Sequence, residues 1–167
     1  VKIQKRDLET SDTKGQGSAT LKDAEFEIIS LNDNAVLVEG KLYNKGEVVK
    51  TILTDIEGVA STSADLLPYG KYRIEESKAP EGYLTDSAEP IEFEITEDGK
   101  IVDLTGTDTS IYNQVKRGDL EGVKIGDGTH QRLAGVPFRI TSKTTGESHI
   151  IVTDDNGQFS TSSDWAS

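Results

Sequence analysis

The sequence predicts an all-β protein, on three observations. Short runs of β-branched and aromatic residues alternate with polar residues, which is the two-residue period of a strand. Gly, Asn, Asp and Pro separate these runs and mark turns. No segment shows the period of about 3.6 residues that an amphipathic helix requires. Seven such runs fall within the first 116 residues, and together they suit a β-sandwich.

The elements follow in order along the chain. Residues 1–5 form the first expected strand, and the Ser, Thr, Gly and Asp content of residues 10–20 predicts a flexible surface loop after it. A turn is expected at residues 43–46 and another at residues 96–100, while residues 77–89 have little periodicity. The other expected strands are residues 25–31, 35–43, 48–53, 70–76, 91–95 and 110–115.

The composition excludes several classes of function. Thirty acidic and 18 basic residues give a net charge of −12, which repels phosphate backbones, so we expect no nucleic-acid binding. The chain has no Cys, so it lacks disulfides, thiolate metal sites and thiol catalysis, and no pattern indicates a metal or a cofactor. No apolar run approaches the roughly 20 residues of a membrane span, so no membrane insertion is expected.

An internal repeat predicts the domain boundary. Residues 21–28 (LKDAEFEI) return as residues 133–140 (LAGVPFRI), and residues 54–63 (TDIEGVASTS) return in the same order as residues 153–162 (TDDNGQFSTS). The interval between the two matches is 13 residues longer in the first copy, which predicts a longer hairpin within residues 31–50. We therefore expect a complete domain over residues 1–116 and the N-terminal part of a second, similar domain over residues 117–167.

Three expected strands each place one reactive polar residue on an apolar face. Side chains alternate along a strand, so an amine, a carboxyl and a carboxamide fall in phase with apolar neighbours. An unpaired buried charge costs several kcal/mol, so such a trio needs a reason to exist, and amide formation between the amine and the carboxamide would supply one. The three faces are Val1, Ile3 and Lys5, then Tyr72, Ile74 and Glu76, then Ile111, Asn113 and Val115.

Four further segments are informative when taken together: Lys5-Arg6-Asp7, residues 21–26, residues 72–83 (YRIEESKAPEGY) and Tyr112-Asn113. Together they resemble a known family, the Cna B-type (SpaA-like) domains of Gram-positive surface adhesins and pilins. The resemblance covers residues 1–116 as a whole domain and the rest as the front of another. It implies a prealbumin-like, Ig-like β-sandwich with an intramolecular isopeptide bond between a first-strand Lys and a last-strand Asn or Asp, assisted by a buried Glu.

The resemblance assigns a role to each member of the trio. Lys5 is the nucleophile, Asn113 its partner, and Glu76 the assisting acid, because Glu76 directly precedes Ser-Lys-Ala-Pro. Strand phase also favours Glu76 over Glu75. Desolvation favours the neutral forms of a buried amine and a buried acid, so Lys5 would attack the carboxamide while Glu76 polarises the amide oxygen and transfers protons. The reaction happens once per chain, so the protein is not a turnover enzyme.

The second copy carries a weaker candidate nucleophile, Lys124. Val123 and Ile125 flank it, so simple alternation places Lys124 on the face opposite the core unless a bulge near Gly122 changes the phase. No counterpart of Asn113 follows it in the sequence, so we expect no bond within this copy.

These features predict a structural stalk module of a cell-wall-anchored adhesin or pilin on the outside of a Gram-positive bacterium. Neighbouring domains of the same surface protein would be its partners. One alternative is an adhesin domain that binds host extracellular matrix protein or carbohydrate through loops such as residues 10–20 or 31–50. Another is the accessory β-sandwich of a secreted hydrolase, although no nucleophile and base pair is visible. The sequence leaves any ligand open.

Four smaller features have plain interpretations. Residues 117–119 (Arg-Gly-Asp) form a tripeptide that some integrins bind, but they fall in an expected linker. Residues 154–157 (Asp-Asp-Asn-Gly) suggest a calcium loop but lack its later Glu, so a turn is the better interpretation. His130 and His149 are expected on the surface. Trp165 is expected to pack in the core of the second copy.

Overall fold

The computed structural model describes residues 1–143 and 146–162, and it is all-β apart from one short 3₁₀ helix, η1 (Thr85–Ser87). The chain divides into two compact units, Val1–Lys116 and Arg117–Ser167. Trp165 lies outside the described residues, so its expected packing is untested. Among the residues that the structure describes, no helix is long and apolar enough to cross a membrane.

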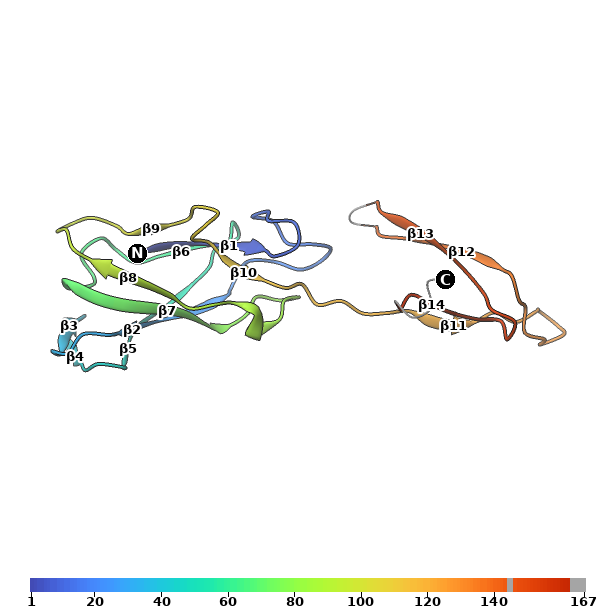
Figure 1. Cartoon of the computed structure of the whole chain (residues 1–167), viewed down its shortest axis with the longest axis horizontal. Coiled ribbons are helices and arrows are strands. Elements are labelled where there is room, and N and C mark those ends of the chain that lie inside the picture. The colour runs from blue at the N-terminus through green and yellow to red at the C-terminus, as the bar shows by residue number, and fades with distance from the viewer. Residues whose placement is uncertain (144–145, 163–167) are drawn as a thin grey trace. The chain divides into compact units, whose positions relative to one another are not determined.

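One layer of the first unit is an antiparallel sheet whose strands lie in the order β5-β2-β7-β8 (Figure 1). Phe26, Ile28, Tyr72 and Ile74 are buried on its inner face, as their alternation in the sequence predicts. Its strands are β2 (Glu25–Ser30), β5 (Val48–Leu53), β7 (Gly70–Lys78) and β8 (Ile91–Ile95).

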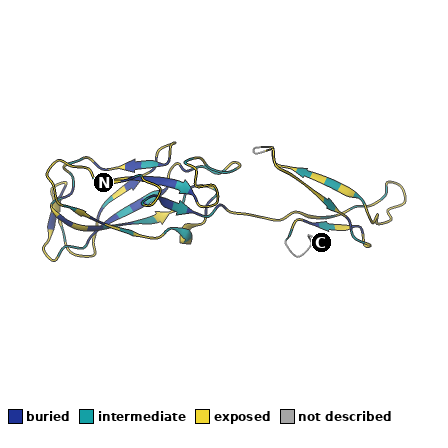
Figure 2. Ribbon diagram, turned by 45° about the horizontal axis from the view of Figure 1, so that its top comes forward, coloured by how far each residue is buried: buried dark blue, intermediate teal, exposed yellow. Residues whose placement is uncertain are grey.

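The second layer is built around β1 (Lys2–Asp7). This strand pairs antiparallel with β6 (Val59–Ser61) and parallel with both β9 (Asp103–Leu104) and β10 (Ile111–Asn113). Apolar side chains of both layers form one buried core, which Figure 2 shows as dark blue on the strands of the first unit. The predicted β-sandwich is therefore confirmed. The first and last strands, β1 and β10, are hydrogen-bonded neighbours in one sheet.

The predicted strand at residues 35–43 is wrong, because the chain turns back on itself there. It forms a hairpin of β3 (Val36–Val38) and β4 (Lys41–Tyr43). The turn residues Glu39 and Gly40 both have positive φ, at 48° and 80°, which is typical of the tightest hairpin turns. The longer hairpin expected in the first copy is therefore present, and Val36 and Val38 pack in the core.

The loop at residues 10–20 has no regular structure, yet hydrogen bonds and a small apolar cluster hold it. Thr20 N–H donates to the Glu81 carbonyl at 3.1 Å. Beside this bond, Ala19 packs against a second small core made by Leu21, Tyr83 and Val115. The C-terminal end of the loop is therefore anchored by residues that lie far from it in the sequence.

Over its described residues, 117–143 and 146–162, the second unit contains four strands in two antiparallel pairs. They are β11 (Glu121–Val123) with β14 (Gln158–Ser160), and β12 (Pro137–Thr141) with β13 (Ser148–Val152). These pairings match β1 with β6 and β2 with β5 in the first unit. The repeated sequence therefore has a repeated local structure.

One threonine in each unit makes the same buried bonds. Thr54 Oγ1 donates to the Leu21 carbonyl at 2.6 Å and accepts from Ala24 N–H at 2.9 Å. Thr153 Oγ1 donates to the Leu133 carbonyl at 2.7 Å and accepts from Val136 N–H at 2.8 Å. These shared hydrogen bonds explain why a threonine occupies the equivalent position in each repeat.

Candidate functional site

Lys5 lies in the middle of β1 with its side chain inside the sandwich and 0% exposed. Its Nζ is 2.9 Å from Glu76 Oε1 and 5.6 Å from the centre of the Phe26 ring. Burial lowers the pKa of Lys5, and the neighbouring Glu76 carboxylate opposes this shift without cancelling it. A larger fraction of this amine is therefore neutral than for a lysine in water.

Glu76 reaches the same interior from the opposite sheet. Its side chain is 1% exposed, because it follows the inward phase of Tyr72 and Ile74 on β7. Glu75 points the other way, and Arg73 Nε lies 3.0 Å from Glu75 Oε2 outside the core. Strand phase thus places the two neighbouring glutamates as the sequence predicts.

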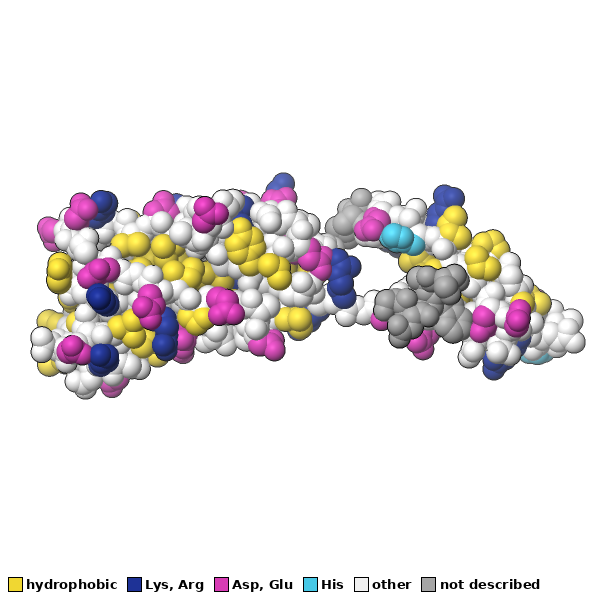
Figure 3. Space-filling model, viewed as in Figure 1, with side chains coloured by type: hydrophobic (Ala, Val, Ile, Leu, Met, Phe, Trp, Pro, Cys, Tyr) yellow, Lys and Arg dark blue, Asp and Glu magenta, His cyan; other side chains and the backbone are white. Residues whose placement is uncertain are grey.

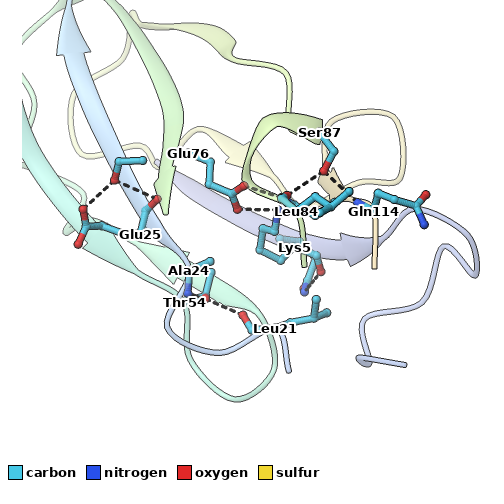
Figure 4. Close-up of polar contacts among 12 residues, drawn as sticks. Lys5, Leu21, Ala24, Glu25, Thr54, Glu76, Leu84, Ser87 and Gln114 are labelled. Atoms are coloured by element: carbon cyan, nitrogen blue, oxygen red, sulfur yellow. Dashed lines mark hydrogen bonds and ion pairs between the residues drawn. The ribbon is translucent and has the colours of Figure 1, made fainter. Parts of the chain in front are cut away.

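Asn113 completes the group from β10, where it is fully buried. Its Nδ2 donates to Glu76 Oε2 at 2.6 Å and to the Leu84 carbonyl at 2.7 Å. One carboxylate therefore contacts the Lys5 amine with one oxygen and the Asn113 amide with the other. Figure 4 shows Lys5, Glu76 and Leu84 close together at this site. The structure brings all three predicted residues together.

The contact between Glu76 and the amide differs from the one expected. Glu76 was expected to polarise the amide oxygen, but it lies on the amide nitrogen instead. The reason is the Leu84 carbonyl, a second acceptor on the same nitrogen, against which an amide oxygen would be repelled. Among the described residues, no donor reaches the buried Asn113 Oδ1.

Comparison with protein families decides the identity of the fold. A family model for SpaA, described as a prealbumin-like fold domain, matches residues 6–110. The chain belongs to the SpaA family of prealbumin-like domains. A search of curated proteins gave no significant match.

Several solved structures resemble this SpaA-family chain. The *Bacillus anthracis* TIE protein is 26% identical with a TM-score of 0.56, over 95% of this chain and 25% of that one. A streptococcal ancillary pilin is 22% identical with a TM-score of 0.44, over 95% and 48%. The shaft pilin SpaA of *Lactobacillus rhamnosus* GG is 15% identical with a TM-score of 0.39, over 95% and 79%. The chain thus spans a quarter of the TIE protein and about half of the ancillary pilin.

The family match shows the class of fold, a prealbumin-like domain. Figure 3 shows acidic and basic side chains interspersed on the visible face of the first unit.

Asp7 is a buried residue of the SpaA-type unit to which the sequence assigned no role. It lies two residues beyond Lys5 and accepts hydrogen bonds from Thr10 N–H at 2.9 Å, Gln16 Nε2 at 3.0 Å and Tyr83 Oη at 2.8 Å. Burial acts to raise the pKa of Asp7, but these bonds outweigh it and the pKa is lowered. The available signal was its place in the Lys5-Arg6-Asp7 motif.

Lys124 occupies the backbone position of Lys5 in the second unit. Its N–H donates to the Gly157 carbonyl at 2.8 Å, as Lys5 N–H donates to the Gly58 carbonyl at 2.8 Å. The pairing of β11 with β14 is unbroken, so no bulge is needed. The expected phase was wrong, because the apolar neighbours of Lys124 are the residues that point outward: Val123 is 44% exposed and Ile125 is 47% exposed.

The predicted turn at residues 154–157 and the two histidines lie where the sequence predicts them. Asp154 Oδ1 accepts from Asn156 N–H and Gln158 N–H, both at 2.8 Å, so residues 154–157 form the predicted turn. His130 and His149 are exposed, as expected. In the part of the chain that the structure describes, no three His, Cys, Asp or Glu side chains gather as a metal site would require.

Proposed function

We propose that this chain is a stalk or adhesin module stabilised by an autocatalytic isopeptide bond between Lys5 and Asn113, assisted by Glu76. One observation carries the proposal. A single buried carboxylate joins a buried amine, at 2.9 Å, to a buried carboxamide, at 2.6 Å. Held reactants reach effective molarities of about 10⁵–10⁸ M, which allows an unreactive amide to exchange once without a cofactor.

The reaction balances within the trio. The neutral Lys5 amine attacks Asn113 Cγ and passes a proton to Glu76, and Glu76 gives a proton to Asn113 Nδ2. The new bond joins Lys5 Nζ to Asn113 Cγ, the bond from Cγ to Nδ2 breaks, and one ammonia leaves. The lowered pKa of Lys5 supports the first step, because only the neutral amine is nucleophilic.

The bond would protect the fold in two ways. It closes a loop of more than one hundred residues, which by analogy with disulfides stabilises by about 4–5 kcal/mol. It also joins the first and last strands of the unit, β1 and β10, which already lie side by side. Tension applied along the chain would pass directly from β1 to β10 through the covalent link, and the strands between them would carry little load.

The second unit supports an extension of this proposal. Its four strands repeat β1, β2, β5 and β6, and Lys124 repeats the backbone bond of Lys5. We infer that residues 117–167 are the front of a second domain of the same family, and that Lys124 is its nucleophile. In the cell, the chain would then be one link in a cell-wall-anchored series of similar domains.

Intact-mass spectrometry tests the bond. Wild-type protein should be one ammonia lighter than its sequence, while Lys5→Ala and Glu76→Ala should show their full masses. Glu75→Ala is the matched control, because Glu75 is adjacent but lies outside the core, and it should lose ammonia like the wild type. A folded wild-type protein at full mass would overturn the bond and leave the sandwich in place.

A further inference from the structure

We propose that the segment Tyr83–Ser87, here called the clasp, orients the Asn113 carboxamide for attack, with the Leu84 carbonyl as the orienting group and Ser87 as a positioning residue. The proposal rests on the isopeptide reaction proposed above. It adds a second acceptor on the departing nitrogen and a reason why the site takes a carboxamide. Figure 4 shows Leu84, Ser87 and Gln114 beside Glu76.

The first step is the geometry at Asn113 Nδ2. This nitrogen carries two hydrogens and has two acceptors, Glu76 Oε2 at 2.6 Å and the Leu84 carbonyl at 2.7 Å. The terminal torsion of an asparagine is otherwise broad, so two acceptors in different places define the plane of the carboxamide. Glu76 alone would leave that plane free to rotate about one hydrogen bond.

The second step is how the Leu84 carbonyl is held. Ser87 Oγ donates to this carbonyl at 3.0 Å and accepts from Gln114 N–H at 3.0 Å. Leu84 N–H donates to the Gln114 carbonyl at 2.9 Å. The clasp is therefore bonded from both sides to the residue that follows Asn113. A hydroxyl can make both bonds through one atom, which alanine at position 87 cannot do.

The third step is the link between the clasp and the strand of the nucleophile. Tyr83, which precedes Leu84, is buried, and its Oη donates to Asp7 Oδ2 at 2.8 Å. Asp7 lies on β1 two residues after Lys5, and it is also buried. The orienting carbonyl and the attacking amine are thus positioned from the same strand.

The clasp favours the reaction and selects its substrate. Nδ2 gains a proton as it leaves, so the Leu84 carbonyl binds it more strongly in the transition state than in the starting amide. A carboxylate at position 113 would instead place an oxygen lone pair against the Leu84 carbonyl. The site is therefore built for an amide that releases ammonia.

The test compares rates of ammonia loss. Chains are made in a short cell-free pulse, and the mass is followed with time and normalised to the fraction that resists protease. Ser87→Ala should react about tenfold more slowly, because displacing a reacting group costs rate steeply. Ser87→Thr keeps a hydroxyl and should return the rate to within about twofold of the wild type. Tyr83→Phe, which frees the other end of the clasp, should also slow the reaction.

Ser77→Ala is the matched control. Ser77 Oγ bonds to Glu25 Oε1 at 2.7 Å on the outside of β7, so its loss should leave the rate unchanged. A wild-type rate for folded Ser87→Ala would overturn the clasp while the isopeptide bond stands. Equal slowing in Ser87→Ala and Ser87→Thr would also overturn it. A wild-type chain that folds and never loses ammonia would instead overturn the proposed reaction itself.

Discussion

The two units share the same hydrogen bonds around an equivalent lysine, Lys5 in the first and Lys124 in the second. Only the lysine of the first unit is fully buried. Lys5 and Lys124 donate equivalent backbone bonds, and Thr54 and Thr153 bridge equivalent groups. Lys5 is nevertheless fully buried, whereas Lys124 is half-buried. Figure 2 shows the strands of the second unit mainly as exposed or intermediate. The repeat therefore sets where the lysine lies, and the strands that follow the repeat, β7 and β10, bury it.

The units also differ in the sizes of two side chains that lie opposite each other on neighbouring strands. In the first unit the large Ile3 lies opposite the small Ala60. In the second, Gly122 lies opposite Phe159, and a Cβ on Gly122 would come within 2.5 Å of the Phe159 ring. Each pair thus combines one large and one small residue, with the order reversed.

The residue two positions after the lysine differs between the units: it is Asp7 in the first and Gly126 in the second. Asp7 N–H donates to the Asp12 carbonyl at 3.0 Å, and Gly126 N–H donates to the Gln131 carbonyl at 2.8 Å in the equivalent turn. Gly126 has no side chain, so the second unit has no carboxylate where Asp7 binds its loop and Tyr83. The turn itself depends on backbone bonds, and the carboxylate adds the anchoring of distant segments.

The largest expected difference between the units is in lysine reactivity. In Asn113→Ala, which keeps Lys5 unlinked, acetic anhydride should modify Lys124 at least about a hundredfold faster than Lys5, because a buried amine reacts only when the structure opens. Peptide mapping by mass spectrometry measures both rates in one sample. Exposed Lys22 serves as the control and should react at least as fast as Lys124. Similar rates for Lys5 and Lys124 would contradict the burial difference.

The equivalent threonines provide a smaller effect. Thr54→Val leaves Ala24 N–H and the Leu21 carbonyl unpaired in the core, which should lower the unfolding free energy of the first unit by about 2 kcal/mol. Thr153→Val breaks the same bonds in the second unit and should leave the first unit unchanged. Hydrogen exchange of β2 and β7 amides reads the first unit alone. A matching loss there in Thr153→Val would show that the units unfold together.

The smallest expected effect is a difference in pH dependence at Asp7. Its folded pKa is lowered, so its contribution to stability is present above the unfolded pKa and is lost as the pH falls through the folded one. Unfolding by urea between pH 6 and about pH 3 should show a steeper acid loss for wild type than for Asp7→Asn, chiefly below about pH 4. Equal slopes would mean that Asp7 is held no better in the folded chain than in the unfolded one.

Alternation along the chain predicted most strands of the sandwich, since one face of each long strand is buried and the other is solvated. It missed β6 and β9, which have three and two residues and are too short to show a period. It also joined β3 and β4, because the turn at Glu39 and Gly40 interrupts the apolar pattern by only two residues.

The identities of Lys5, Glu76 and Asn113 followed from strand phase and from the resemblance to a family, because both depend on side chains that the sequence displays. The Leu84 carbonyl had no such signal, since every residue has a backbone carbonyl and its direction depends on the path of the chain. The amide orientation of Asn113 follows from that carbonyl. Alternation also predicted the wrong inward face for β11. Apolar residues mark the inward face only where a second layer covers them, and Val123 and Ile125 are exposed.

The residue pattern was therefore sufficient for the class of fold, the repeat and the inward placement of Lys5, Glu76 and Asn113, all of which depend on local alternation and spacing. The enclosure of Lys5, the bridge through Glu76 and the hold on Asn113 depend on contacts between strands far apart in sequence. Lys124 demonstrates the distinction, because it has the same backbone setting as Lys5 and lacks its enclosure. Removing the lysine from water requires the later strands, so its burial and its lowered pKa are properties of the assembled sandwich.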